Sequence, residues 1–351
     1  MGVKKAIMMR VSEAKEIVRG NLVGVPSISE FEGITSLADK VKRGWLFIAK
    51  DCSNTTLKKV LENGAYGIIY AKDSLSLEQR DEEIAWIEVD DIGDAVVRLV
   101  RDIILRYDIS VVSFNKVQYA IGTQIIVDRG VLFSDGDFFA LLESITPHTR
   151  YIMTGEQKLL TIVFNVLSLL RPLNMPFNLI SYTLFDMRVF YNSKEYLLNM
   201  PFLFVDDLSA LIGFCEDRSI LFDMAKFQSL PFLKPNFIDS FGRRKEYGES
   251  QRVLIVEENL VFFEDYVRYL DKFAKWGKKV YLLPKDKEHA SWIFIRGQRF
   301  LFYRSYEEIF DFIRNEEFNF MLILGLGNDG LARIFELAAF ENAPSLFDGV
   351  C

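Results

Sequence analysis

The sequence predicts an α/β protein built of three parts. Its 351 residues suffice for two or three domains, since one domain commonly takes about 100–200 residues. Short apolar runs alternate with amphipathic helical segments at both ends of the chain, whereas the pattern changes near Ser110 and again after Pro231. These observations predict parts at residues 1–108, 109–244 and 245–351.

The N-terminal part is expected to form a small α/β domain. A helix over residues 11–18 precedes a turn-rich stretch and an apolar strand that ends at Ala49. Residues 55–64 fit a helix with Gly64 just beyond its end, where a positive φ angle is common. The remaining expected elements are two strands and one amphipathic helix, at 65–70, 84–89 and 91–107.

The middle part has a less regular pattern. Residues 111–133 are rich in β-forming residues, and residues 138–145 fit a helix. A strand over 151–154 is expected to turn into an apolar helix that runs to Leu170. Three strands with a turn at Asn192, two helices and a loop-like boundary follow, at 178–198, 206–215, 219–230 and 231–250.

The C-terminal part alternates cleanly between strands and helices. The expected strands lie at 252–256, 279–283 and 320–324, with a β-like stretch at 292–302. The expected helices lie at 261–276, 306–314 and 331–340. This alternation predicts a Rossmann-like, doubly wound domain with a mostly parallel sheet.

Charge and composition exclude several classes of function. The net charge of −7 argues against nucleic-acid binding, which needs concentrated Lys and Arg. Three cysteines and two histidines, far apart in the sequence, match no metal-ligand spacing, so we expect neither a metal site nor a catalytic residue of these types. Because no apolar run is long enough for a signal peptide or a membrane span, the expected location is the cytoplasm.

The turn after residue 154 is the first candidate site. Phosphate-binding loops lie at such strand-to-helix junctions, and Gly155 and Lys158 are the candidates for holding a nucleotide here. A working loop also needs a second glycine before the lysine and a hydroxyl directly after it, which reaches Mg²⁺. Leu159 stands where the hydroxyl is needed, and Glu156 adds negative charge. The alternative is an ordinary helix start, because Thr154 and a Gln three residues later fit a capping box.

A glycine-rich turn near the C-terminus is the second candidate site. Gly325, Gly327 and Gly330 fit G-x-G-x-x-G between a strand and a helix, the context of a dinucleotide loop. No later strand supplies the acid that would hold the ribose, so a tight turn is the alternative explanation. Arg243, in a run of three basic residues, is a further candidate for holding a phosphate.

Several segments, in order along the chain, resemble the Mur ligases, and most closely the UDP-N-acetylmuramoyl-tripeptide:D-alanyl-D-alanine ligases. The segments similar to the family's uridine-binding domain, ATP loop and C-terminal domain are residues 40–49 and 61–69, then 151–155, and finally 241–246, 252–258 and 277–283. The resemblance implies a three-part architecture with a shortened central domain.

The departures from the family pattern concern its chemistry. The uridine-contacting Asp-Ser-Arg of the family would fall on Leu37, Ala38 and Asp39. The resemblance also implies a segment with a magnesium-binding Glu, a His and a carbamylated Lys after the ATP loop, and no counterpart precedes Phe177. ATP-driven ligation needs metal-held phosphates and charge stabilisation, which these residues do not assemble.

The sequence therefore predicts a non-catalytic, Mur-ligase-like pseudoenzyme with a degenerate phosphate loop and no cofactor. By family analogy it is expected to bind a protein partner in peptidoglycan precursor synthesis, or a nucleotide or UDP-sugar ligand. Two alternatives stay open: an active ATP- and Mg²⁺-dependent amide ligase with an altered site, and a nucleotide-sugar-binding sensor. A large exposed apolar patch would favour partner binding.

Overall fold

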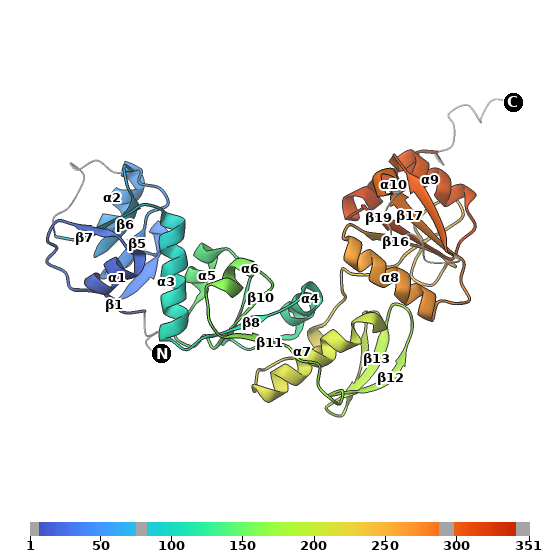
Figure 1. Ribbon diagram of the computed structural model, residues 1–351, viewed down its shortest axis with the longest axis horizontal. Coiled ribbons are helices and arrows are strands. Elements are labelled where there is room, and N and C mark those ends of the chain that lie inside the picture. The colour runs from blue at the N-terminus through green and yellow to red at the C-terminus, as the bar shows by residue number, and fades with distance from the viewer. Residues whose placement is uncertain (1–6, 75–82, 288–297, 342–351) are drawn as a thin grey trace. The chain divides into compact units, whose positions relative to one another are not determined.

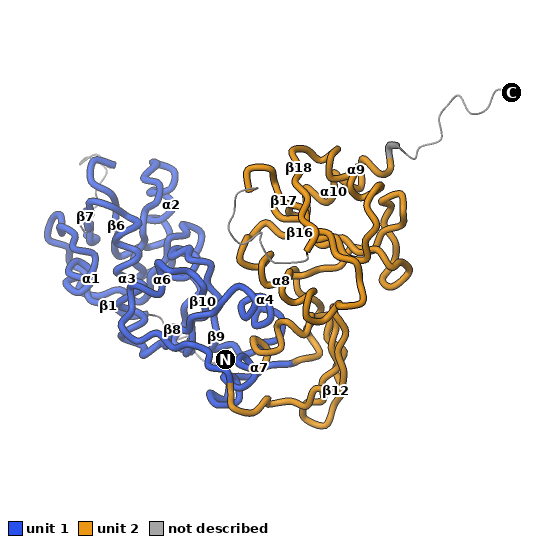
Figure 2. Tube along the Cα trace, turned by 45° about the vertical axis from the view of Figure 1, so that its right-hand side comes forward, with its two compact units in different colours: residues 1–171, 210–223 blue, residues 172–209, 224–351 orange. Residues whose placement is uncertain are grey.

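The computed structural model describes residues 7–74, 83–287 and 298–341, and these fold into two compact units. Residues 1–171 and 210–223 form unit 1, and residues 172–209 and 224–351 form unit 2 (Figure 2). Helices and largely parallel sheets confirm the predicted α/β class. The three-part division at residues 108 and 244 stays a prediction.

The N-terminal sheet of unit 1 has five strands in the order β2-β7-β6-β5-β4. All neighbouring pairs are parallel except β2 with β7. Its strands are β2 (Asn21–Val23), β4 (Gly33–Thr35), β5 (Trp45–Ile48), β6 (Gly67–Ala71) and β7 (Ala85–Val89). A separate antiparallel pair is formed by β1 (Met9–Arg10) and β3 (Glu30–Phe31), and the helices are α1 (Val11–Val18), α2 (Asn54–Glu62) and α3 (Ile92–Arg106).

The predicted glycine stop of α2 is confirmed. Gly64 has φ +82°, and its N–H donates to the carbonyl oxygen of Leu61. The N–H of Ala65 donates to the carbonyl oxygen of Val60, which completes the hydrogen-bond pattern of a Schellman ending. The left-handed backbone at this position explains why the sequence has glycine there.

The second sheet of unit 1 is entirely parallel, in the order β11-β8-β10-β9. Its strands are β8 (Ser110–Ser113), β9 (Val131–Ser134), β10 (Tyr151–Thr154) and β11 (Val166–Ser168). The helices between them are α4 (Lys116–Ile125), α5 (Phe138–Ser144) and α6 (Gln157–Thr161). A single buried core joins α1 and α3 to α5 and to β8 and β10.

Three predictions for the middle of the chain were wrong. Residues 111–133 contain α4, because Val117, Ile121 and Ile125 recur at helical spacing and are buried. The helix expected up to Leu170 ends at Thr161, since the chain then pairs with β8 as β11. Residues 219–230 contain only a short 3₁₀ turn, Met224–Lys226. By contrast, α7 (Val205–Asp217) covers the helix predicted at 206–215.

Unit 2 contains an antiparallel three-stranded sheet, whose order is β12-β13-β14. Its strands are β12 (Asn178–Tyr182), β13 (Met187–Tyr191) and β14 (Lys194–Leu198). The predicted turn is confirmed: Asn192 and Ser193 have φ of 47° and 63°, the sign that a two-residue hairpin turn requires.

The second sheet of unit 2 has the order β15-β16-β19-β17-β18 and is parallel except at β15. Its strands are β15 (Asn236–Ile238), β16 (Arg252–Glu257), β17 (Lys279–Pro284), β18 (Arg299–Tyr303) and β19 (Phe320–Leu324). Its helices are α8 (Leu260–Phe273), α9 (Tyr306–Asn315) and α10 (Asn328–Glu341). The loop expected over 231–250 therefore contains one strand, β15.

This sheet is doubly wound, as predicted. Helices α9 and α10 pack on the face that carries Leu254, Leu282 and Ile323. Helix α8 packs on the other face, where Phe263 contacts Tyr281. Figure 1 shows the strands of this sheet between α8 and the α9–α10 pair. Within the ranges that the structure describes, no helix combines the length and apolar character that crossing a membrane requires.

Candidate functional site

The carboxyl ends of β8 and β10 lie at a topological switch point of the parallel sheet in unit 1. The two strands are neighbours in the sheet. From β8 the chain crosses over β10 to form β9, whereas from β10 it crosses over β8 to form β11. Open α/β sheets bind ligands at such a switch point. Gly155 lies here, and a Cβ atom on it would stand 3.0 Å from the Phe114 carbonyl oxygen. Asn115 and Lys116, which the sequence analysis did not select, follow β8 at the same edge.

The start of α4 at this edge is capped by the chain's own side chains, whereas the start of α6 has no side-chain cap. Asn115 Oδ1 accepts a hydrogen bond from the Gln118 N–H at 2.8 Å, and Gln118 Oε1 accepts one from the Asn115 N–H at 3.1 Å. In this capping box the N–H groups of Asn115 and Gln118 donate to side chains, so they are not free to donate to a phosphate. The Thr154 hydroxyl accepts from the Glu156 N–H at 3.0 Å.

The capping box predicted at Thr154 was wrong. The N-cap of α6 is Glu156, two residues after Thr154, and no side-chain cap is formed there. Helix α6 has only five residues, and Leu159 is fully buried in the core. Lys158 is exposed.

Carboxylates lie at the same edge, together with Lys116 and Lys158. The side chain of Glu156 lies against Gly136, whose φ of +91° suits glycine. The pKa of Tyr119 is raised, first by burial and then by the charges of Asp135 and Glu156. A phosphate at this edge would therefore meet carboxylates.

The glycine turn at 325–330 also lies at a switch point. Strands β16 and β19 are neighbours, and their following helices, α8 and α10, pack on opposite faces. Gly325 has φ +86°, and its N–H donates to the Glu257 carbonyl oxygen at 2.7 Å. A Cβ atom on Gly327 would stand 2.5 Å from Glu258 Oε1. The Glu258 carboxylate thus lies where a ligand was expected to approach Gly327. Gly330 lies within α10.

The predicted site residues are divided between the two units. Gly155 and Lys158 belong to unit 1, whereas Arg243 and the glycine turn belong to unit 2. Arg243 follows β15 near the amino end of the parallel sheet, opposite to Gly325. Its guanidinium forms an ion pair with Asp239 at 2.8 Å. Burial would raise the pKa of Asp239, but hydrogen bonds from Arg243 and from a backbone N–H hold it below its usual value.

A carboxylate fills a polar nest at the carboxyl end of β4. Glu143 of α5 accepts from the Thr35 hydroxyl at 2.8 Å and from the Ser36 N–H at 2.6 Å. The Ser36 hydroxyl donates to it as well, and Lys40 Nζ lies 3.6 Å from its second oxygen. This nest adjoins residues 37–39, where the resemblance implied a uridine contact, and Asp39 there pairs with Lys59.

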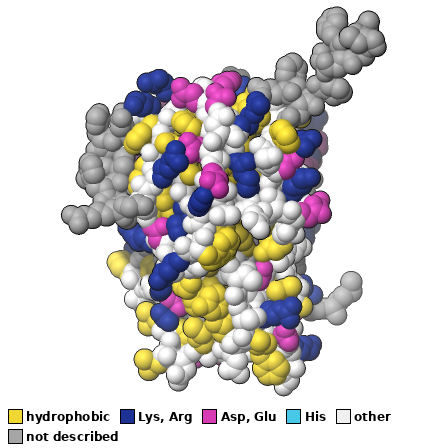
Figure 3. Space-filling model, turned by 90° about the vertical axis from the view of Figure 1, so that its right-hand side faces the viewer, with side chains coloured by type: hydrophobic (Ala, Val, Ile, Leu, Met, Phe, Trp, Pro, Cys, Tyr) yellow, Lys and Arg dark blue, Asp and Glu magenta, His cyan; other side chains and the backbone are white. Residues whose placement is uncertain are grey.

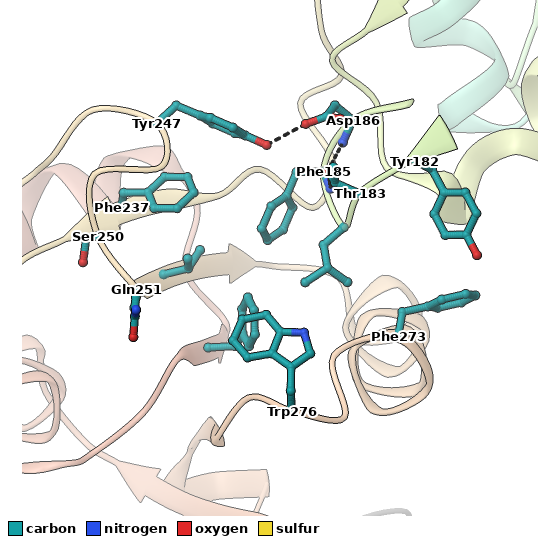
Figure 4. Close-up of a pocket in the computed structure, with 13 residues that line it drawn as sticks. Tyr182, Thr183, Phe185, Asp186, Phe237, Tyr247, Ser250, Gln251, Phe273 and Trp276 are labelled. Atoms are coloured by element: carbon teal, nitrogen blue, oxygen red, sulfur yellow. Dashed lines mark hydrogen bonds between the residues drawn. The ribbon is translucent and has the colours of Figure 1, made fainter. Parts of the chain in front are cut away.

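An open aromatic groove lies at the amino end of the parallel sheet of unit 2 (Figure 4). Its volume is about 600 Å³. The turn between β12 and β13 forms one wall, and the end of α8 with the loop that follows it forms another, through Phe273 and Trp276. We call this feature the aromatic groove, and its lining residues are Tyr182, Thr183, Leu184, Phe185, Asp186, Phe237, Tyr247, Ser250, Gln251, Val253, Phe273, Trp276 and Phe320.

Ring contacts hold the walls of the groove. Phe320, the first residue of β19, contacts both Trp276 and Phe185, with ring centroids 5.5 Å and 6.4 Å apart. Tyr182 meets Phe273 edge-on at 6.1 Å. Such edge-on and tilted pairs add about 0.5–1.5 kcal/mol each beyond the burial of area, so the walls are well packed.

One hydrogen-bonded pair spans the upper wall in Figure 4. The Tyr247 hydroxyl donates to Asp186 Oδ2 at 2.8 Å, and the Tyr247 ring packs against Phe237 at 5.0 Å. Burial and this carboxylate raise the pKa of Tyr247 to about 12. Because the hydroxyl stays protonated at neutral pH, it acts as the donor in this hydrogen bond.

The rings at the rim of the groove are open to solvent. Trp276 is 71% exposed, Tyr247 62% and Tyr182 46%. Figure 3 shows hydrophobic side chains gathered on one side of the molecule among charged ones. Exposed apolar patches on proteins occur at protein–protein contacts and in ligand-binding grooves.

Comparisons with solved structures returned likenesses across nearly the whole chain. A MurF from Acinetobacter baumannii has a TM-score of 0.49 at 10% identity, over 95% of this chain and 100% of that one. Other Mur ligases are among the matched structures. They include MurF from Thermotoga maritima in complex with ADP, with a TM-score of 0.49 at 11% identity, over 88% of this chain and 98% of that one.

A more distant ligase of the family is matched as well. The UDP-N-acetylmuramate-alanine ligase MurC from Thermotoga maritima has a TM-score of 0.38 at 11% identity, over 85% of this chain and 94% of that one. No protein-family model matches the sequence, and no curated protein does. At these identities the likeness to Mur ligases concerns the fold alone.

Proposed function

We propose that this chain is a non-catalytic, Mur-ligase-like protein that binds a protein partner. The observation that carries the proposal is the aromatic groove of unit 2, with Trp276, Tyr247 and Tyr182 exposed at its rim. Trp and Tyr dominate the energetics of protein interfaces, because they bury a large area at little entropic cost. An exposed apolar patch favours partner binding over an active ligase or a nucleotide-sugar sensor.

Side chains at the carboxyl ends of the two parallel sheets support the non-catalytic part of the proposal. A nucleotide at β8 and β10 would compete with the Asn115–Gln118 capping box and would lie beside Glu156. At the glycine turn it would have to displace the Glu258 carboxylate from Gly327. Both crevices thus have the chain's own groups where phosphate oxygens would be held.

The link to peptidoglycan precursor synthesis is the second half of the proposal. It is supported by the resemblance in sequence to the Mur ligases and remains an analogy of fold. Retained UDP-sugar binding would make the chain a sensor, and the Glu143 nest speaks against it, because a carboxylate already accepts the hydroxyl and N–H donors there.

An assay of ADP formation tests the proposal. The full chain is incubated with ATP, Mg²⁺, UDP-N-acetylmuramoyl-tripeptide and D-alanyl-D-alanine, and ADP is measured by coupled oxidation of NADH. We expect no ADP beyond the protein-free rate. ADP formed in equal amount with an amide product, and requiring both substrates, would show an active ligase with an altered site.

A further inference from the structure

We propose that the aromatic groove receives an arginine side chain carried on an apolar, extended segment of a partner protein. This inference rests on the proposed partner-binding function and names the chemistry of the partner. It follows from the charge of the groove, the faces of its rings and its openness.

The groove has a single charged side chain, and it is acidic. Asp186 lies in its upper wall, and one carboxylate oxygen accepts from the Tyr247 hydroxyl. A carboxylate has about four acceptor positions, so further donors are accommodated. Within the part of the chain that the structure describes, no lysine or arginine forms an ion pair with Asp186. A cation from outside would therefore complement this wall.

The rings favour a guanidinium as that cation. Arginine stacks on the faces of Trp and Tyr and donates two parallel hydrogen bonds to a carboxylate, whereas lysine offers one point charge. Lys272 and Lys275 lie on the α8 side, so we place the incoming cation at the Asp186 wall in Figure 4.

The openness of the groove favours a protein segment over a small molecule. Sites for small ligands are enclosed enough to bury about 70–90% of the ligand surface. This groove is more open, because Trp276 and Tyr247 at its rim are each more than half exposed. An extended chain covers such rings with the side chains that flank the arginine. Apolar neighbours are expected in those positions, because Leu184, Phe185 and Phe320 line the groove.

Two capped tripeptides test the inference on the full-length chain. Acetyl-Leu-Arg-Leu-amide carries the cation, and acetyl-Leu-citrulline-Leu-amide is its neutral counterpart of nearly the same shape. We expect calorimetry to show binding of the arginine peptide about tenfold tighter than of the citrulline peptide. Trp276→Ala should weaken it by a similar factor, whereas Val261→Ala, an exposed apolar change at the start of α8, should leave it unchanged.

A pair of variants separates charge from loop geometry. Asp186→Asn removes the charge, and Tyr247→Phe removes the hydrogen bond but leaves the carboxylate. We expect only Asp186→Asn to reduce binding of the arginine peptide to the level of the citrulline peptide. Equal binding of both peptides, no binding of either, or equal losses in both variants would overturn the inference. ADP formation is measured separately, so this failure would not by itself contradict the non-catalytic proposal.

Discussion

The partly buried carboxylate of Glu143 accepts hydrogen bonds from residues more than a hundred positions away in the sequence. Its side chain is 12% exposed and accepts from Thr35 and from both donors of Ser36. Glu143→Ala should lower the free energy of unfolding by about 1–3 kcal/mol, because Thr35 and Ser36 are buried and would lose their acceptor. Urea unfolding measures this change.

A matched control is Glu62→Ala in α2. Glu62 forms an exposed pair with Lys58 at 3.9 Å, and its loss should cost less than about 0.5 kcal/mol. Similar losses in the two variants would show that the Glu143 nest adds nothing beyond a surface ion pair.

Tyr303 should give the stability a measurable dependence on alkaline pH. Its hydroxyl donates to the Leu324 carbonyl oxygen at 2.6 Å, just before the glycine turn, and burial raises its pKa from 10.0 to about 12. Because the folded pKa exceeds the unfolded one, this contribution is complete below pH 10.0 and is lost as the pH rises through about 12.

Comparison with Tyr303→Phe isolates that residue. Near neutral pH the variant should be less stable by about 0.5–1.5 kcal/mol, because the hydrogen bond is lost. The advantage of the native protein should then shrink between pH 10.0 and 12. Urea unfolding across this range would contradict the account if the difference between the two proteins stayed constant.

Single residues of the candidate sites were the least predictable feature. The sequence located Gly325 and Gly327 in a turn between a strand and a helix, but not Glu258 against Gly327. Glu258 arrives from a different strand end, so only the sheet order brings the two together. The rings of the aromatic groove come from four separate segments for the same reason, and no local pattern marks them.

At the scale of elements, the turn between β13 and β14 depends on its backbone. Asn192 and Ser193 both have positive φ, which glycine adopts freely and β-branched residues resist. Ser193→Val should therefore cost about 1–2 kcal/mol. Ser193→Gly should be neutral or stabilising, since it fits the favoured Asn-Gly turn.

Thermal or urea unfolding of the two variants decides between backbone strain and side-chain loss. Both substitutions remove the Ser193 hydroxyl, so they differ in the backbone preference of the new residue. Equal stability of the valine and glycine variants would show that the positive φ at this turn is not a constraint.

Elements with strong local signals were predicted, and elements decided by distant pairing were not. The alternation of the last third and the Gly64 stop follow from nearby residues, and the structure confirms both. The stretch after Thr161 has apolar residues that suit either a helix or a strand. It becomes β11 because β8 offers an unpaired edge, which the sequence alone does not reveal.

At the scale of the whole molecule, the core of unit 1 bears on the predicted boundary at residue 108. Val96 and Leu99 of α3 share one buried cluster with Val111, Leu141 and residues further along the chain. Residues 1–108 expressed alone should therefore unfold at a lower temperature than in the full chain. Near-ultraviolet circular dichroism measures the transition, and an unchanged, cooperative midpoint would support a true domain boundary there.

The central claim is that the chain's own groups close the crevices where a ligase would hold ATP. Isothermal calorimetry of ATP and Mg²⁺ with the full-length chain tests it most directly, because binding precedes any reaction and needs no second substrate. The account predicts no saturable heat up to millimolar nucleotide. Micromolar affinity that is lost in Lys116→Ala or Lys158→Ala would contradict it, since it would place the phosphates at the edge formed by β8 and β10.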